Sequence, residues 1–432
     1  MKRESVFFAL AMCCLALLAQ QPLPQEEIAR NPQLSASNNL AYQAPATAQT
    51  PAPSGKKAFY LSHYGRHGSR HLTKVKDYDY VLDALQKADE KGKLTPLGKD
   101  VLRRVKLLCQ NAYGRWGDLT PLGGQQHREI VSRMMSNYPD VFKGAAHVDA
   151  RTTMVPRCVL SMTHTIQQMT KQNPKLNITF DASYHDMSYM NFQDKALVNK
   201  ANNERSRKAY DAYCRRHQSW KRAMASLISD SVYFRKHFNG ERVNYYLFRL
   251  AGNVQDTELR DELTLYDIYT SEELLENWRM ENAYWYLGYS FSSLNGGKQP
   301  YSQRNLLRKM IQQADSCLLL PKPGAHLRFG HETMVLPLVC LMGINGYDTA
   351  VDDLELLEQK GWVNYRIVPM GCNIQLVFYR KNLQDKDVLV KVLLNEREAV
   401  LPVKTDVAPY YHWSDVREHY LKMLDAYVSE VE

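Results

Sequence analysis

The chain has 432 residues, of which 44% are hydrophobic and 23% are charged, and its formal net charge is +9. This composition excludes a wholly disordered chain and a bundle of membrane-spanning helices, while the length allows a sizeable core with an accessory domain. The excess of positive charge suits an anionic ligand without identifying one.

The first nineteen residues have the layout of a secretory signal peptide. A basic pair at residues 2–3 precedes an apolar run over residues 6–19, which is too short to span a bilayer and is followed by polar residues. We therefore expect cleavage near Ala19 and export, to the periplasm or out of the cell. The alternative is a lipid anchor on Cys13 or Cys14. No second long apolar run occurs, so we expect no integral membrane span.

Residues 20–56 are expected to form a flexible linker. The segment is rich in Gln, Asn, Ala, Pro, Ser and Thr and shows no apolar periodicity. The first folded section then covers residues 57–184, with helices expected over 77–90, 96–111 and 122–138. Two of these helices follow a Thr-Pro pair, which combines a good N-cap with a good first helical residue.

The strongest indication of chemistry comes where a strand-like run gives way to a basic turn. The apolar, aromatic residues 58–61 are typical of a buried strand and lead into an Arg-His-Gly-x-Arg motif at residues 66–70. Glycine lets the backbone approach a ligand closely, and Arg66 and Arg70 each offer a planar, permanently charged fork that fits phosphate oxygens in pairs. A neutral His67 between these forks is placed to attack a phosphorus atom that they hold.

A second strand-to-helix turn supplies a further arginine. Residues 147–152 are strand-like, and Pro156 opens a helix, so Arg157 lies in its first turn. A helix N-terminus carries free N–H groups and the positive end of the dipole, so Arg157 there projects toward an anion site. The alternative is a surface arginine without a partner.

The pattern changes between residues 185 and 317, where apolar residues recur at helical spacing and strand-like alternation is scarce. We expect a helical domain inserted between two halves of an α/β core. Residues 199–222 contain eight Lys or Arg against two Asp or Glu. This charge forms either a solvated helix face or a basic wall over the active site. In the second case the residues that contact further phosphates are Arg205, Arg207, Lys208, Arg215 and Arg216.

A third chemical element lies late in the chain. A strand-like run ends at Gly330, and His331-Glu332 then opens a very apolar helix over residues 334–342. The pair is no zinc-protease motif, because Val335 stands where the second histidine is required. A carboxylate at this point also favours the helix dipole, so its chemistry depends on where the fold places it.

The remainder is expected to form late core strands over residues 362–368, 373–379 and 388–393, closed by a helix near 414–428. Six cysteines remain after signal cleavage, which permits up to three disulfides in an oxidising compartment without setting their pairing. These cysteines are Cys109, Cys158, Cys214, Cys317, Cys340 and Cys372.

From about residue 57 onward the chain resembles the histidine phosphatase superfamily, in its acid phosphatase and phytase branch. The resemblance rests on the motif at residues 66–70, on a Leu-Thr-x-x-Gly-x-x-Gln helix start at 119–126 and on the His-Glu pair after Gly330. Within that branch the chain is most similar to multiple inositol-polyphosphate phosphatases.

The resemblance implies an α/β fold, in which a mixed sheet flanked by helices forms the catalytic core. That core is discontinuous and combines residues 57–184 with residues 318–432. Residues 185–317 are then a mainly helical domain that covers the substrate.

Two positions depart from the family pattern. His71 and Leu72 follow the first motif, where many acid phosphatases have a proline. The second motif reads His-Glu-Thr, whereas inositol-polyphosphate phosphatases typically carry His-Ala-Glu, so Thr333 occupies the place of their acid. These departures concern the substrate and leave the reaction class unchanged.

The resemblance implies two-step phosphoryl transfer through a phosphohistidine at His67. Glu332 then protonates the leaving alcohol and afterwards activates water against the intermediate. Neither a cofactor nor a metal is implied, because arginines already neutralise the phosphate. Arg151 is the runner-up for the place of Arg157. The groups expected to bind the phosphoryl oxygens are Arg66, Arg70, Arg157 and His331.

We therefore expect an exported phosphomonoesterase that hydrolyses inositol polyphosphates such as phytate, with an anionic small molecule and no nucleic acid as its partner. Two alternatives stay open: a broad-specificity acid phosphatase for sugar or other organic phosphates, and a non-catalytic relative that binds polyanions. A phosphomutase of the same superfamily fits poorly with export. The weaker candidates for substrate binding are His71, Lys74, Arg151, Arg205, Arg207, Lys208, Arg215 and Arg216.

Overall fold

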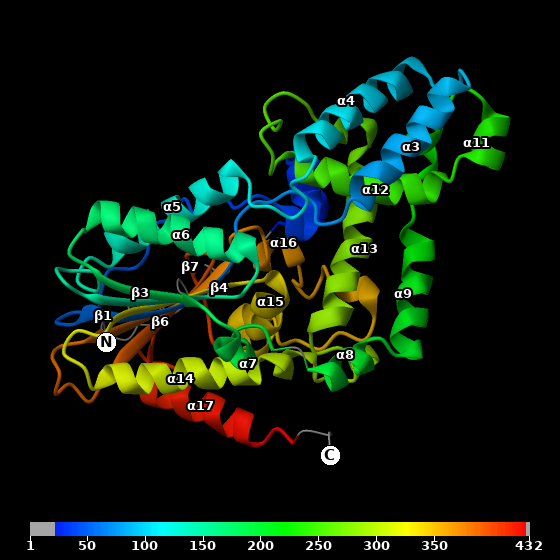
Figure 1. Ribbon diagram of the computed structural model, residues 1–432. Helices are drawn as coiled ribbons and strands as arrows, with labels where there is room; N and C mark the ends of the chain where they lie inside the picture. Colours follow the sequence, from blue (N-terminus) through cyan, green and yellow to red (C-terminus); the bar gives the residue numbers. More distant parts are fainter. Residues whose placement is uncertain (1–21, 193, 429–432) are drawn as a thin grey trace, which may run out of the picture.

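The computed structural model describes residues 22–192 and 194–428. It consists of a sheet covered by helices on both faces and a helical lobe at one end of that sheet (Figure 1). The expected signal peptide, with Cys13 and Cys14, lies outside the described residues. Over the described ranges, none of the helices combines the length and the apolar character needed to cross a membrane.

The sheet is mixed, with the strand order β3-β2-β4-β1-β5-β6-β7, and β8 pairs with β6. The first four strands run parallel to one another, and the later strands join them antiparallel. This architecture confirms the predicted α/β fold class. The strands are β1 (Lys57–Arg66), β2 (His147–Thr152), β3 (Asn177–Ala182), β4 (Gly324–Gly330), β5 (Asn373–Arg380), β6 (Leu389–Leu394), β7 (Arg397–Glu398) and β8 (Tyr410–His412).

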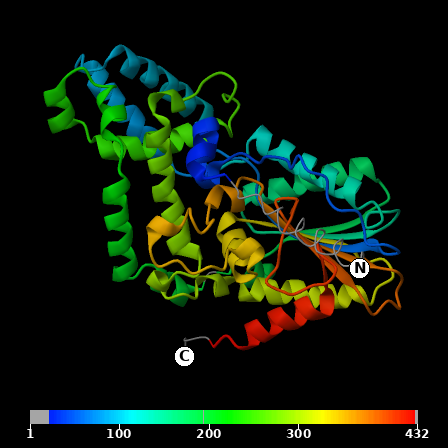
Figure 2. The same ribbon diagram turned by 180° about the vertical axis from the view of Figure 1, so that it is seen from behind.

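The central strand β1 contributes side chains to two separate apolar cores, one on each face of the sheet. Leu61 points into the core beneath α5 (Pro121–Asn137) and α6 (Pro156–Gln172), whereas Tyr60 and Tyr64 point into the opposite core. This alternation follows from the two-residue period of a strand, and burial on both faces is typical of parallel strands. The helices that cover the second face are α14 (Arg304–Leu318), α15 (Glu332–Leu341) and α17 (Trp413–Asp425) (Figure 2).

The helical lobe draws on two separate parts of the sequence. Its helices from the insertion are α8 (Lys195–Ala201), α9 (Glu204–His217), α10 (Lys221–Ala225), α11 (Ser231–His237), α12 (Gly240–Val254) and α13 (Ser271–Tyr289), whereas the short helix α7 (Met187–Met190) lies beside α14. However, α3 (Lys76–Glu90) and α4 (Pro96–Ala112), which the expected boundaries assign to the core, share one apolar cluster with α12. Periodicity shows that a helix has an apolar face but not which element covers it. The division at residues 184 and 317 stays a prediction.

The segment predicted to be a flexible linker is folded. It contains α2 (Pro24–Arg30) and the 3₁₀ segment η2 (Pro32–Asn39), both packed against α13, and Ile28 is fully buried. Farther along, Thr50 accepts a hydrogen bond from Lys391 through its carbonyl oxygen. The prediction of a linker is wrong because this polar segment is ordered by hydrogen bonds to distant residues, which composition does not reveal.

One smaller expectation also fails. The predicted strand over residues 362–368 contains instead the one-turn helix α16 (Asn364–Ile367), whose Asn364 bonds the indole of Trp278. Tertiary contacts here override the strand preference of the local residues. The six cysteines considered for disulfides, all within the described residues, are free thiols.

Candidate active site

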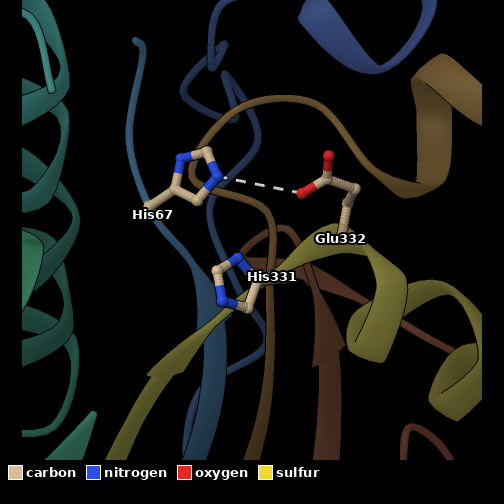
Figure 3. Close-up of side chains that lie close together, drawn as sticks. All are labelled: His67, His331 and Glu332. Atoms are coloured by element: carbon tan, nitrogen blue, oxygen red, sulfur yellow. Dashed lines mark ion pairs between the residues drawn. The ribbon is translucent and has the colours of Figure 1, made fainter. Parts of the chain in front are cut away.

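The pairing of β1 with β4 brings the two chemical motifs together. Arg66, the last residue of β1, lies opposite Gly330, the last residue of β4, and the amide of His67 donates to the Gly330 carbonyl at 3.0 Å. The carboxyl ends of neighbouring parallel strands meet at one edge of a sheet, so the residues just after these two strands share a crevice. His331 is the N-cap residue of α15 and Glu332 its first residue. Figure 3 shows their side chains converging on His67.

His67 is held in one tautomer by its own loop. Its Nδ1 lies 2.9 Å from the carbonyl oxygen of Gly68, which accepts a hydrogen bond only if Nδ1 carries the proton. Nε2 is then unprotonated and lies 3.8 Å from Oε2 of Glu332. Burial lowers the pKa of His67 well below its usual value, and the charges of Arg66 and Arg157 lower it further. A neutral imidazole with a free lone pair therefore faces the crevice.

Guanidinium groups that lack full hydrogen bonding surround this imidazole. NH1 of Arg66 donates to the carbonyl oxygens of Asn38 and Val368, but its buried NH2 has no partner among the described residues. The same holds for the buried Nε atoms of Arg70 and Arg157. A buried donor left unpaired costs about 1–3 kcal/mol, so this arrangement favours an anion that supplies acceptors.

Glu332 lies at the edge of this positive cluster and is ionised when the site is empty. Burial raises its pKa, but the charges of Arg66 and Arg70 outweigh burial and hold the pKa at about 2. Its Oε2 lies 2.9 Å from Nε of Arg66. The carboxylate thus neutralises part of the cluster until a ligand arrives.

His331 completes the crevice. Its Nε2 lies 3.2 Å from the hydroxyl of Thr153, and the ring centroids of His331 and His67 are 5.8 Å apart. Burial lowers the pKa of His331 to about 4, an effect that Glu332 opposes and Arg157 supports. His331 is therefore also neutral near pH 7.

The donor atoms of His67, His331 and Glu332 all lie within 4.8 Å of one another, a spacing that a metal ion also accepts. The charge of the surroundings argues against such a use. Arg66, Arg70 and the nearby Arg157 are cations that repel a metal and attract an anion. The site is therefore built for an anion such as a phosphate.

The sequence matches the model of the histidine phosphatase superfamily (branch 2) over residues 65–395. The chain belongs to this superfamily. It is accordingly a phosphoric monoester hydrolase.

Solved structures of similar fold include a multiple inositol polyphosphate phosphatase and two phytases. The Bifidobacterium longum multiple inositol polyphosphate phosphatase in complex with inositol hexasulfate has a TM-score of 0.74 at 15% identity, covering 89% of this chain and 97% of that one. The phytase from D. castellii has a TM-score of 0.65 at 15% identity, covering 95% and 90%. The Hafnia alvei phytase with tartrate has a TM-score of 0.53 at 14% identity, covering 86% and 98%. No curated protein matches the sequence. At such identities these likenesses show the shared fold.

The loop that carries the phosphatase motif is braced by residues that the sequence reasoning did not single out. A Cβ on Gly68 would lie 2.4 Å from the carbonyl oxygen of Gly123, so the loop packs directly on the start of α5. The amide of Ser69 donates to Gln126, and its hydroxyl donates to Asp256 at 2.6 Å. Gly123 and Gln126 belong to the helix-start pattern at residues 119–126, and this pattern was the feature of the sequence that could have identified them. Nothing in the sequence marks Asp256.

Asp256 is fully buried and anchors the loop from the turn that follows α12. Burial raises its pKa to about 7, although its hydrogen bond with Ser69 and the charge of Arg70 act in the opposite direction. Asn253, one helical turn earlier, donates both to Asp256 and to the carbonyl oxygen of Arg70. The helical lobe therefore fixes the backbone that positions the phosphatase motif.

The segment before β1 also reaches the site. Asn38 donates through Nδ2 to Oε1 of Glu332 at 3.2 Å. Its neighbour Ser37 adopts φ 61° and ψ −126°, a conformation that costs a non-glycine residue of order 1–3 kcal/mol. The side chain of Asn364 donates to the hydroxyl of Ser37. Sequence reasoning missed Asn38 because its segment looked like a linker.

The two alternative arginines and His71 have different surroundings. Arg157, at the start of α6, is among the charges that act on His67, whereas Arg151 forms ion pairs on β2 and beyond it with Asp149 and Asp181. His71 is buried, and neither ring nitrogen has a partner among the described residues. Burial lowers the pKa of His71 to about 4. The structure thus brings Arg157 to the crevice and holds Arg151 elsewhere.

The basic residues expected to form a wall over the site are exposed, and two of them form ion pairs. On α9, Lys208 pairs with Glu204 and Arg216 pairs with Glu355. Further exposed basic side chains are those of Lys74, Arg205, Arg207 and Arg215. A role for these residues in holding further phosphates stays a prediction.

Proposed function

We propose that the protein hydrolyses inositol polyphosphates through a phosphohistidine on His67. The observation that carries this proposal is the neutral His67 imidazole, which has its Nδ1 proton directed to Gly68 and its Nε2 exposed to a crevice between Arg66, Arg70 and Arg157. The guanidinium groups hold the three peripheral oxygens of a phosphate monoester and stabilise the charge of the transition state. His331 forms a hydrogen bond with one of the same phosphate oxygens.

The first step forms a bond between Nε2 of His67 and phosphorus while the ester P–O bond breaks in line. The electron pair of the broken bond stays on the leaving oxygen, which takes a proton from Glu332 and departs as an alcohol. In the second step the Glu332 carboxylate removes a proton from water. The resulting hydroxide attacks phosphorus, the P–N bond breaks, and inorganic phosphate leaves with His67 neutral again.

The proton that Glu332 donates arrives with the substrate. Glu332 is ionised in the empty enzyme, but a bound phosphate adds negative charge beside it and draws on Arg66, which had stabilised the carboxylate. Both effects raise the pKa of Glu332. A phosphate monoester that binds as its monoanion can therefore pass its proton to Glu332 before the ester bond breaks.

The choice of inositol polyphosphates rests on two supports. The fold resembles that of a multiple inositol polyphosphate phosphatase whose structure contains inositol hexasulfate. The exposed basic residues of α9 and Lys74 also offer charge for further phosphate groups. The Thr333 departure from the inositol-phosphatase pattern keeps the second candidate open, a broad-specificity acid phosphatase.

We expect the protein to release phosphate from inositol hexakisphosphate with a higher kcat/KM than from glucose 1-phosphate or an aryl phosphate, since only the first can engage several cations at once. Phosphate release and inositol phosphate products are measured side by side for the three substrates. The His67→Ala variant is the control and should show no turnover above background. Equal kcat/KM values on the three substrates would favour the broad-specificity phosphatase, and turnover by His67→Ala would remove the nucleophile.

Glu332→Gln should lower kcat for alkyl phosphates by about 10²- to 10⁴-fold, the usual contribution of a general acid. Aryl phosphates should lose much less, because a phenolate leaves without needing a proton. Steady-state rates on a series of leaving groups test this expectation. A uniform loss over the series would assign the donor to another group.

The pH dependence of kcat/KM follows from which groups carry a proton, His67 and the substrate. Because the pKa of His67 is lowered, acidification through pH 6.5 does not protonate the nucleophile. Above about pH 6, the second pKa of a phosphate ester, the substrate loses the proton that Glu332 needs. We expect kcat/KM to stay level between about pH 4.5 and 5.5 and to fall about tenfold per unit above pH 6.5. A kcat/KM that instead rises through pH 6.5 would mean that His67 titrates normally.

We also propose that the protein is exported. Expressed from its first residue in a bacterium with two membranes, it should be recovered from the periplasm with a new N-terminus near Gln20, as read by mass spectrometry. A variant without residues 2–19 should stay in the cytosol. A lipid mass on Cys13 or Cys14 in the membrane fraction would favour the anchor instead.

A further inference from the structure

Asn38 contacts both charged groups of the candidate donor site from a segment that precedes the family match at residues 65–395. Its amide Nδ2 donates to Oε1 of Glu332 at 3.2 Å, and its carbonyl oxygen accepts from NH1 of Arg66. The side chain is buried, with 8% of its surface exposed. One residue therefore bonds the carboxylate and the guanidinium that form the ion pair beside His67.

The chemistry of the contact fixes the orientation of the Asn38 amide. The reverse orientation would direct its oxygen at an oxygen of the ionised Glu332, with two acceptors facing each other. Only the N–H orientation gives an attraction. Oε1 is therefore occupied by a hydrogen-bond donor. Oε2 forms the ion pair with Nε of Arg66 at 2.9 Å, without the geometry of a hydrogen bond, and lies 3.8 Å from Nε2 of His67, on the side where the phosphate would be attacked. A bound phosphate that draws on Arg66 leaves this oxygen able to take a proton.

We propose that Asn38 is a positioning residue for the proton donor: its amide occupies Oε1 of Glu332 and leaves Oε2, the oxygen that faces His67, to carry the proton. This inference rests on the proposed function of Glu332 as general acid. The amide touches neither the phosphate nor the leaving group and acts through the carboxylate alone.

The segment around Asn38 is held firmly enough for this role. Ser37, in its unusual conformation, is fixed by Asn364 on one side. On the other side the carbonyl oxygen of Leu40 accepts from the amide of Met370 at 2.8 Å. The next amide, that of Gly371, donates to the carbonyl oxygen of His67 at 2.9 Å. Asn38 and the nucleophile are thus positioned by one short stretch of chain.

Several ionisable groups act on Glu332 together with Asn38. The donor from Asn38 stabilises the ionised carboxylate, so it lowers the pKa of Glu332, and its removal raises that pKa. Arg66 and Arg70 act in the same direction. The charged and titratable groups that face Glu332 from the packed elements are Arg66, His67, Arg70, Cys158, Tyr289, His331 and Cys372.

The test is Asn38→Ala in the full chain. Hydrogen bonds to charged groups are among the stronger ones, so we expect kcat on alkyl phosphates to fall about tenfold, with KM within about twofold. On an aryl phosphate the loss should be less than about threefold. The decline of kcat at alkaline pH, the alkaline limb of the profile, should move to higher pH by about half to one unit, because Glu332 stays protonated up to a higher pH.

Asn39→Ala is the matched control. It removes a buried amide of the same size from the next position, whose side-chain oxygen has no hydrogen-bond partner among the described residues. Asn38→Asp keeps the shape of the side chain and the backbone contact with Arg66, and it should shift the alkaline limb further upward because two carboxylates then face each other. This variant gives the same reading if Asn38→Ala does not fold.

The positioning role would be overturned if Asn38→Ala lowered kcat equally for all leaving groups and left the alkaline decline of kcat where it is in the wild type. Asn38→Ala would then behave like Asn39→Ala. Failure of the proposed function would give a different result. The wild-type protein would then release no phosphate, or Glu332→Gln would lower kcat equally for good and poor leaving groups. A selective loss and a shifted limb in Asn38→Ala, absent from Asn39→Ala, would support the role.

Discussion

The parallel pairing of β1 with β4 is the contact on which the site depends. It sets Arg66 opposite Gly330, and therefore places His67 beside His331 and Glu332, although more than 250 residues separate the two motifs. The intervening chain forms β2, which lies on the other side of β4, and the helical lobe. A slip of this register by one residue would reverse the faces of β1 and separate His67 from Glu332.

The electrostatics of the crevice follow from burying several cations around one imidazole. The arginines cannot lose their protons near neutral pH, so the histidines lose theirs instead, and His67 and His331 are neutral. Glu332 and backbone carbonyl oxygens stabilise Arg66 in the empty site. Among the described residues, guanidinium N–H groups of Arg66, Arg70 and Arg157 remain without hydrogen-bond partners, which favours an anion in this crevice.

The segments that brace the site come from outside the motifs. Asp256 and Asn253 hold the loop from the helical lobe, while the chain before β1 supplies Asn38 from the opposite direction. The family match begins at residue 65, so it includes Asp256 and Asn253 but not Asn38. The fold shared with other phosphatases therefore accounts for the crevice, and a segment outside the family match contacts Glu332.

The sequence by itself determined the reaction class and most of the local elements. Arg-His-Gly-x-Arg at residues 66–70, after a strand, and His331-Glu332, at a helix start, carry their chemistry in residue types and short-range order, which local sequence encodes. Only the tertiary structure decided that Arg157 lies at the crevice and Arg151 does not, that α3 and α4 join the helical lobe, and that residues 24–39 are ordered. These outcomes depend on contacts between residues far apart in the chain, and composition and periodicity contain no record of such partners.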